Sequence, residues 1–462
     1  MKVNRVRRCL LTLATAATPA VAGGQGFGLN EIGTCALARG FAATGAPCND
    51  ASAIFWNPAA GTTLQGVTVL AGASAVSLGG RFTADVTGRG DDASVPLEIP
   101  PHFFVNWRAT PRLAAGVGAY VPYGLTSEWR SDFPGRFVAQ RASLATIYVQ
   151  PNVSFEIMPG RLSIGGGPVI GHSSVELKQA LDISEQGVPG LPITFGQLGV
   201  LSGTQFATAT LRGDATAYGV HVGVFARVLP TLTVGARYLS QMNFKYDDAR
   251  ASFEQVVTGF RIPAPTATNP NNFIPLDAAL LPQFQDGGPL TQQGVKTNIK
   301  HPAQIELGVG FTGIPNTTLS LDGAFVQWSS FDELPVDFQG GAPDRTLIED
   351  YENTFGVRAG IEYTFQFGFA GRAGFSYAPA PAPDETVTPL LPDQDRYNFS
   401  VGFGIPLGSR YALDLGYLRV ETEGRRGRIV DRTSRSQTAE ELNSGAYTLD
   451  ADIFAISLKA LF

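Results

Sequence analysis

Charged residues are scarce in this sequence. Asp, Glu, Lys and Arg make up 16% of the 462 residues, whereas soluble domains carry about 25%. The net charge of −6 comes without a basic patch or basic helix, so the chain lacks the electrostatic footprint of a nucleic-acid-binding protein. No apolar run reaches the roughly 18 residues of a membrane-spanning helix. Length alone suggests two or three soluble domains, but the composition argues against that class.

Residues that carry catalysis are also few. The chain has only four histidines, and no Gly-x-Ser-x-Gly motif accompanies them, so a nucleophile–His–carboxylate triad is not indicated. No metal-ligand spacing, nucleotide-binding loop or redox motif is present. We therefore expect no enzymatic activity, no metal and no cofactor. The four histidines are His102, His172, His221 and His301.

The N-terminus is typical of a secretory signal peptide. Basic residues between Lys2 and Arg8 precede a short apolar stretch that ends in an Ala-x-Ala pattern at Ala22. Residues 1–22 are therefore expected to be removed on export, which leaves two of the three cysteines. Cys35 and Cys48 can form a disulfide in an oxidising compartment, and closing this short loop would stabilise the fold by roughly 3 kcal/mol. The alternative is a pair of buried free thiols.

Residues 23–64 differ from the rest of the chain. The stretch "NDASAIFW" has weak helical character, and Asn49 or Asp50 can cap a helix by accepting backbone N–H bonds. Pro58 moves Asn57 out of the α region and ends that helix. We interpret this segment as a compact hatch with little core of its own.

From residue 65 onward, apolar and polar residues alternate with a period of two. In "FGVRAGIEYTF", Arg358 and Glu362 lie in mid-strand on the face opposite a row of apolar and aromatic side chains. Alternation alone fits any half-buried strand, including one in a large soluble β-sandwich. Charged residues on one face and terminal aromatics on the other are typical of strands between lipid and a polar lumen. The apolar row is Phe355, Val357, Ala359, Ile361, Tyr363 and Phe365.

The gaps between strands alternate between short turns and long polar loops, as in transmembrane barrels. An even number of strands closes the sheet, so that no backbone group is left unpaired in lipid. We predict an all-β fold, a fourteen-stranded antiparallel transmembrane β-barrel over residues 65–462, with residues 23–64 as a partly helical hatch in its lumen. The predicted strands are 65–79, 100–110, 112–122, 141–157, 161–173, 206–228, 231–248, 298–314, 317–331, 351–365, 367–378, 396–406, 410–421 and 446–462.

Several segments resemble the FadL/TodX-like outer-membrane transporters of hydrophobic compounds. The resemblance begins with "GFGLNEIGTCALARGFAATGAPCNDASAIFWNPA", continues through "VPYGLTSEW" at 121–129 and "PDQDRYNFSVGFG" at 392–404, and ends at Phe462. It implies a barrel in the outer membrane of a Gram-negative cell. Substrate would rest in apolar pockets and leave sideways through an opening at a kinked third strand. The Cys35–Cys48 pair departs from the family pattern, and a disulfide there would stiffen the hatch.

The resemblance also implies roles for hatch residues. Asn57, Pro58 and Ala59 would anchor the hatch to the barrel wall, whereas the simpler alternative is a helix stop. Phe27 and Leu29 would line an apolar substrate pocket, or else merely pack against the wall.

Two further sites are expected in the wall. Pro122, Tyr123 and Gly124 interrupt the third strand and would form its lateral opening, or else mark its end. Arg396 would bind a substrate carboxylate, or else pair with Asp393 or Asp395. Other charged residues should face the lumen as a mutually paired network. These are Arg237, Asp322, Arg358, Glu362, Asp414 and Lys459.

The expected function is passive uptake of hydrophobic compounds, foremost long-chain fatty acids. An importer of toluene-type aromatic hydrocarbons has the same architecture and is the alternative. A general porin would lack the hatch, and an adhesin would need long loops but no plug. The expected partners are hydrophobic small molecules and outer-membrane lipid, with the protein acting as a monomer.

Overall fold

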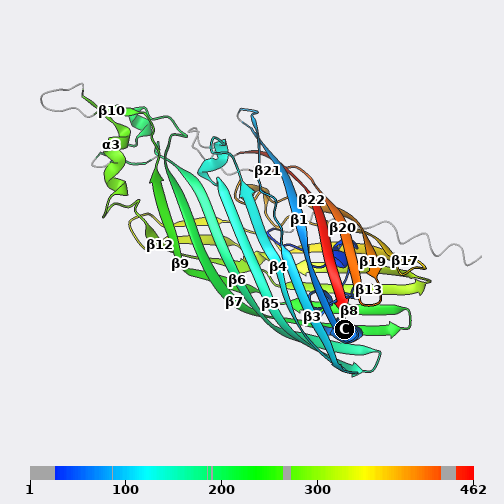
Figure 1. Cartoon of the computed structure of the whole chain (residues 1–462). Coiled ribbons are helices and arrows are strands. Elements are labelled where there is room, and N and C mark those ends of the chain that lie inside the picture. Colours follow the sequence, from blue (N-terminus) through cyan, green and yellow to red (C-terminus); the bar gives the residue numbers. More distant parts are fainter. Residues whose placement is uncertain (1–25, 86, 185, 189–190, 264–271, 428–443) are drawn as a thin grey trace, which may run out of the picture.

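The computed structural model describes residues 26–462 except 86, 185, 189–190, 264–271 and 428–443 (Figure 1). The predicted signal peptide, residues 1–22, lies outside the described residues. Among the described residues, no helix is long and apolar enough to cross a membrane.

Fourteen antiparallel strands close into a single barrel, as the sequence predicts. The first and last strands pair from Thr68–Leu461 to Ala84–Gly445, and Figure 1 shows them side by side in blue and red. The wall runs in the order β1 (Val67–Ala84), β3 (Pro101–Thr110), β4 (Leu113–Glu128), β5 (Arg141–Met158), β6 (Leu162–Asp182), β7 (Gln205–Leu229), β8 (Leu232–Leu239) with β9 (Met242–Gln255), β12 (Gln293–His301) with β13 (Gln304–Ile314), β14 (Thr317–Val326), β17 (Thr354–Thr364), β18 (Ala370–Ala378), β19 (Arg396–Leu407), β20 (Tyr411–Thr422) and β22 (Gly445–Leu461).

The remaining elements lie in the hatch and in the long loops. The longest wall strand, β7, extends past the barrel to a lobe built around buried Phe206, Leu276 and Leu280 (Figure 1). The hatch contains α1 (Thr34–Leu37), α2 (Ala53–Trp56) and η1 (Pro58–Thr63). The loops contain β2 (Gly90–Asp92), η2 (Pro134–Phe137), η3 (Gly196–Leu198), β10 (Arg261–Pro263), β11 (Phe273–Pro275), α3 (Leu276–Leu280), η4 (Leu281–Phe284), η5 (Trp328–Ser330), β15 (Glu333–Phe338), β16 (Arg345–Ile348), η6 (Asp384–Thr386) and β21 (Arg425–Gly427).

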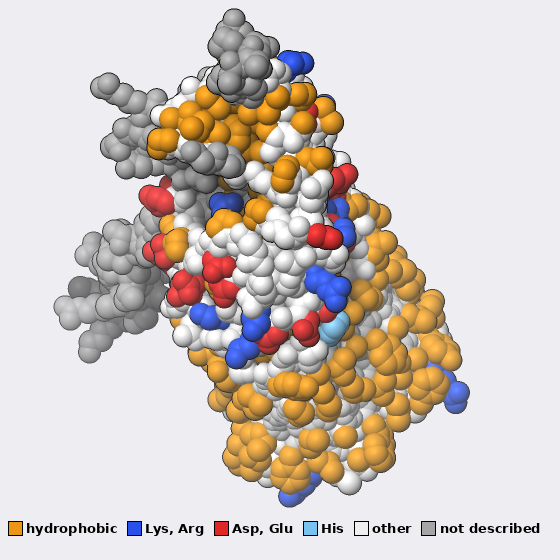
Figure 2. All heavy atoms as spheres, turned by 90° about the vertical axis from the view of Figure 1, so that its left-hand side faces the viewer, with side chains coloured by type: hydrophobic (Ala, Val, Ile, Leu, Met, Phe, Trp, Pro, Cys, Tyr) orange, Lys and Arg blue, Asp and Glu red, His pale blue; other side chains and the backbone are white. Residues whose placement is uncertain are grey.

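The outer face of the barrel is apolar and the inner face is polar. Phe355, Ile361 and Phe454 are exposed on the outside, while Arg358 and Asp414 are buried inside. Figure 2 shows hydrophobic side chains gathered over the lower part of one face, with charged side chains gathered above them. The alternation therefore separates a lipid-like exterior from a lumen filled by the hatch.

Several strands run further than the sequence predicts, and β4 is one of them. The expected strand ended at 122, but β4 continues to Glu128, with a bulge between Tyr120 and Tyr123. Within a strand, the N–H and C=O of one residue point to the same side. The Pro122 carbonyl points away from β5, toward the side where the regular β3–β4 ladder has already stopped. The N–H that proline lacks would point to that same side, so no ladder hydrogen bond is lost. Proline therefore does not end this strand.

Candidate functional site

Asn57 holds the hatch against the wall. Its side-chain nitrogen donates to the Thr44 carbonyl within the hatch and to the Val224 carbonyl of β7, each at 3.0 Å. Its side-chain oxygen accepts from the Ala59 amide at 3.1 Å, so the same residue caps η1. The contact with Val224 agrees with the anchoring role expected of Asn57, whereas the Ala59 amide bonds only within the hatch.

Pro58 provides a second attachment. Its carbonyl accepts from the Asn152 side chain at 3.0 Å and from the Ser154 hydroxyl at 2.7 Å, both on β5. At this contact, the wall positions that face the hatch backbone have no room for a side chain. A Cβ added at Gly165 would lie 2.2 Å from the Pro58 oxygen, and one added at Gly235 would lie 2.0 Å from the Thr44 oxygen. Glycine at these wall positions lets the two backbones approach.

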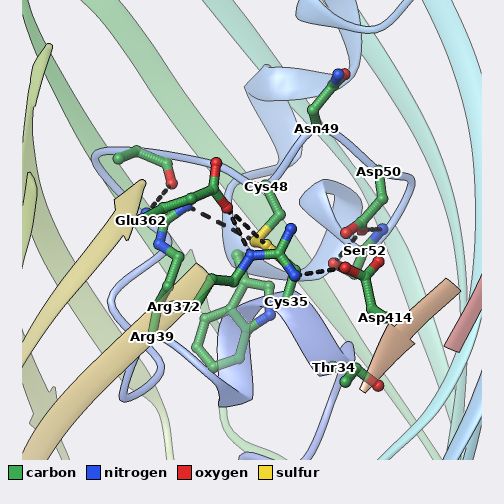
Figure 3. The surroundings of a disulfide bond; sticks show 12 residues. Thr34, Cys35, Arg39, Cys48, Asn49, Asp50, Ser52, Glu362, Arg372 and Asp414 are labelled. Atoms are coloured by element: carbon green, nitrogen blue, oxygen red, sulfur yellow. Dashed lines mark hydrogen bonds and ion pairs between the residues drawn. A yellow bond between two sulfur atoms is a disulfide. The ribbon is translucent and has the colours of Figure 1, made fainter. Parts of the chain in front are cut away.

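Cys35 and Cys48 form a disulfide inside the hatch (Figure 3). The Arg39 guanidinium lies within the loop that it closes and donates to the Ala42 and Ala46 carbonyls, at 2.9 and 2.6 Å. The disulfide and Arg39 together hold the loop 36–47 as one unit. The part of the hatch before Cys35 lies outside that constraint.

Buried ion pairs link strands across the lumen wall, and the hatch hydrogen-bonds to the carboxylates of the wall. Glu306 of β13 pairs with Arg237 of β8 and, at 2.8 Å, with Arg358 of β17. The other oxygen of Glu306 accepts from the Thr44 hydroxyl at 2.9 Å. The Asp322 carboxylate accepts from the Thr44 amide at 2.7 Å.

A second ion-pair group lies beside the disulfide, where Arg372 pairs with both Glu362 and Asp414 (Figure 3). Lys459 donates to the Asn49 carbonyl at 3.0 Å. Of the network expected from the sequence, Arg237, Arg358, Glu362 and Asp414 form ion pairs, with Glu306 and Arg372 as additional members. Asp322 and Lys459 instead bond to the hatch backbone.

The barrel wall has a stretch without a regular ladder between β3 and β4. Their pairing stops at Phe103–Ala119, and the two sides next meet where the Ser94 amide donates to the Glu128 carbonyl. No β3–β4 ladder pair joins the intervening described residues, 95–102 and 120–127. We call this stretch the wall gap.

The start of the hatch takes the place of the missing strand. The Leu29 amide donates to the Pro122 carbonyl and the Gly124 amide donates to the Phe27 carbonyl, both at 2.9 Å. Gly28 thus lies opposite Tyr123 in an antiparallel bridge. Residues 26–31, here called the N-terminal segment, complete the edge of β4 at the three residues predicted to form a lateral opening.

Phe27 fixes the N-terminal segment through an aromatic cage. Its ring packs edge-on against Trp328 and Phe331, with ring centroids 4.8 and 5.2 Å away, and against Tyr123 at 5.8 Å. The His301 ring lies 5.5 Å away. Phe27 is thus enclosed by protein, which matches the simpler expectation that it packs against the wall.

Leu29 lines an apolar cavity of about 350 Å³. The cavity reaches from the lumen to the outer face, because its lining joins buried Ala451 and Ile453 to Ile99 and Ile147, which are 57% and 50% exposed. Gly124 of β4 also lines it. Of the predicted pocket residues, Leu29 and Arg396 meet here, whereas Phe27 does not line this cavity.

Arg396 lies at a polar end of the cavity, together with Glu31, Asp393 and Gln394. It donates to the Gly26 carbonyl at 2.9 Å, and its nearest approach to the Asp393 carboxylate is 4.0 Å. Burial raises the pKa of Asp393 to about 6 and also raises that of Glu31. Asp395, the other partner considered for Arg396, instead accepts from Tyr377 and Ala380.

Sequence reasoning considered Asp393 as a partner of Arg396 but missed Glu31 and Gln394 as members of this end. Glu31 stands within the matched N-terminal stretch, and Asp393 and Gln394 stand within "PDQDR", so each was visible as part of a motif. The two segments come together because both line the same cavity, and no local sequence pattern predicts that contact.

A family model described as "Outer membrane protein transport protein (OMPP1/FadL/TodX)" matches residues 13–462. A long-chain fatty acid transport protein of Salmonella typhi is 24% identical over 416 residues, covering 88% of this chain and 89% of that protein.

Two solved structures share the fold. A FadL homologue of Pseudomonas aeruginosa has a TM-score of 0.76 at 20% identity and covers 95% of this chain and 100% of its own. The toluene transporter TodX of Pseudomonas putida has a TM-score of 0.67 at 15% identity, with 95% and 100% covered. The Salmonella typhi relative is named for long-chain fatty acids, and TodX is named for toluene.

Proposed function

Because this chain belongs to the OMPP1/FadL/TodX family of outer-membrane proteins that transport hydrophobic compounds, we propose that it takes up long-chain fatty acids by lateral release into the membrane. The observation that carries the proposal is the apolar cavity of about 350 Å³, whose lining runs from the lumen to the outer face of the wall gap. A pocket of this kind removes an acyl tail from water, which is favourable by about 0.8 kcal/mol per buried CH₂.

The N-terminal segment supplies the gate in this proposal. Two backbone hydrogen bonds and the Phe27 cage hold it at the edge of β4, beside the cavity. Both hydrogen-bond partners on β4, Pro122 and Gly124, lie in the wall gap. Release of the segment would widen the gap while the disulfide-closed part of the hatch stays in place. Passive flow needs no energy source if the cell consumes the substrate.

Aromatic hydrocarbons are the second candidate substrate. The cavity is lined mostly by aliphatic side chains such as Val76, Leu125 and Leu144, which accept a compact ring as well as a chain. The similarity to TodX supports this alternative at the level of the fold. Uptake measurements with both substrate types decide between them.

Uptake of labelled hexadecanoic acid tests the proposal directly. A Gram-negative host without its own fatty-acid transporter should gain uptake at low substrate concentration when this protein is expressed. Asn57→Ala should lower that uptake severalfold at equal surface expression, because three side-chain hydrogen bonds, worth about 1 kcal/mol each, are lost from the hatch. Asn49→Ala, at an exposed hatch position, is the matched control and should leave uptake unchanged.

Either of two results would count against the proposal. A correctly folded barrel that gives no uptake of hexadecanoic acid but does admit toluene would move the function to aromatic hydrocarbons. Equal uptake by Asn57→Ala and Asn49→Ala would show that seating of the hatch by Asn57 is not needed for transport.

A further inference from the structure

The polar end of the cavity holds more negative than positive groups. Among the described residues that line the cavity, Arg396 alone carries a positive charge. Two of the four carboxyl groups that line the cavity already have partners, since Glu98 accepts from the Thr126 hydroxyl at 2.9 Å and Asp450 pairs with Arg419 at 2.8 Å. The other two belong to Glu31 and Asp393.

Three polar atoms at this end have no hydrogen-bond partner among the described residues. They are Oε2 of Glu31, Oδ1 of Asp393 and Nε2 of Gln394. Asp393 and Gln394 are almost fully enclosed, with exposures of 5% and 1%. Arg396 does not satisfy them, because it donates to the Gly26 carbonyl and stays 4.0 Å from Asp393. Buried polar groups without partners are costly, and a ligand that pairs with them gains accordingly.

We propose that this end of the cavity selects an uncharged head group that both donates and accepts a hydrogen bond, an alcohol or an undissociated carboxylic acid, over a permanently anionic one. This inference rests on the proposed function and specifies the form in which the substrate binds. In this proposal the three side chains, whose unpaired atoms are covered in the present arrangement, turn toward the cavity that they line. The ligand O–H then donates to Asp393 or Glu31, and the ligand oxygen accepts from Gln394. Arg396 positions the N-terminal segment through Gly26.

Electrostatics supports the same selection. An ionised ligand head would be a third anionic group beside a single guanidinium, in a site where burial weakens screening. The raised pKa values of Asp393 and Glu31 have the same origin, because each carboxyl lies where ionisation is poorly compensated. A neutral head meets no such penalty and satisfies an unpaired donor and an unpaired acceptor.

Two ligands with the same tail separate charge from hydrophobicity. Binding of 1-hexadecanol and of hexadecane-1-sulfonate is measured on the full chain in lipid nanodiscs, by displacement of a neutral fluorescent hydrophobe and after correction for partition into lipid. The wild type should bind the alcohol at least about tenfold more tightly than the sulfonate. Glu31→Gln with Asp393→Asn should raise sulfonate affinity by about tenfold and change alcohol affinity by less than about threefold.

Asp384→Asn is the matched control. It removes a carboxylate from the same loop as Asp393, but Asp384 is exposed, pairs with Arg425 and does not line the cavity. The ratio of the two affinities should stay at the wild-type value. Asp393→Asn alone should shift the ratio in the same direction as the double variant, which keeps the test valid if the double variant does not fold.

The outcomes distinguish this inference from the proposed function. Wild-type protein that binds the sulfonate as tightly as the alcohol would overturn the selection while leaving hydrophobe binding intact. Neutralised variants that change both affinities equally would overturn the roles of Glu31 and Asp393. Failure of both ligands to displace the probe would instead count against the proposed function itself.

Discussion

Glu306→Gln is expected to destabilise the folded barrel by roughly 3–5 kcal/mol, because it leaves two buried guanidinium groups without a carboxylate. Arg237, Glu306 and Arg358 are 2%, 1% and 8% exposed, so water cannot replace the lost partner. Asp322 offers little compensation, since its oxygens already face the Thr44 and Gly45 amides. The Thr44 hydroxyl, which donates to Glu306, would have to accept from the glutamine NH₂ instead.

Urea unfolding in lipid vesicles measures this effect, with the folded fraction read from heat-sensitive electrophoretic mobility. Tryptophan fluorescence provides a second signal, to which the hatch contributes through Trp56, fully buried beneath Arg237 and Arg358. Asp92→Asn is the control: its ion pair with Arg81 is exposed, so its loss should cost under about 1 kcal/mol. Similar losses for the two variants would contradict a structural role for the buried network.

Gly124→Phe is expected to lower uptake by at least about tenfold, equivalent to about 1.4 kcal/mol on the barrier. Gly124 lines the cavity at the wall gap, and a Cβ there would already lie 2.9 Å from a Leu29 methyl group. A phenyl ring would therefore fill the route that Leu29 borders. The effect should fall on transport and not on assembly, because the atom nearest the added Cβ is the end of the flexible Leu29 side chain, which can move.

Ala119→Phe is the matched control for this prediction. Ala119 lies on the same strand and pairs with Phe103 and Val149, which are 46% and 39% exposed on the outer face. An added ring there should face lipid and leave uptake unchanged. Equal uptake by Gly124→Phe and wild type would place the substrate route elsewhere.

Much of the barrel follows from local sequence. The strand predicted at 141–157 is observed as Arg141–Met158, and the turn after it contains Gly160 at a φ of 68°, which glycine adopts without strain. Alternation is a strong signal here because lipid on one side and a polar lumen on the other select opposite residue types. Closure by a fourteenth strand then requires only an even count.

Local signals were ambiguous at β4. Pro122 and Gly124 resemble a strand end, and the predicted strand stopped there, because proline usually interrupts a ladder. The ladder is indeed interrupted, but only on one side, so the strand continues to Glu128. The same residues that shortened the predicted strand mark the wall gap.

Contacts between distant segments were harder to predict. Glu306 lies opposite Arg237 in the register of β13 with β8, so that pair follows once the hairpins are placed in order. The meeting of Glu31 with Asp393 and Gln394 does not follow, because it depends on how deep the hatch lies in the lumen. The site residues that the sequence did not predict are therefore those brought together where the hatch contacts the wall.

A reversible lock on the N-terminal segment tests most directly whether substrate leaves through the wall gap. Gly28 and Tyr123 lie opposite each other between flanking hydrogen bonds, a geometry that brings Cβ atoms close enough for a disulfide. Gly28→Cys with Tyr123→Cys should lose uptake of hexadecanoic acid when oxidised and regain it on reduction. The single variants and the wild type, given the same treatments, report any effect of reductant on Cys35–Cys48. Cross-linked protein that transports as fast as its reduced form would contradict gating by this segment.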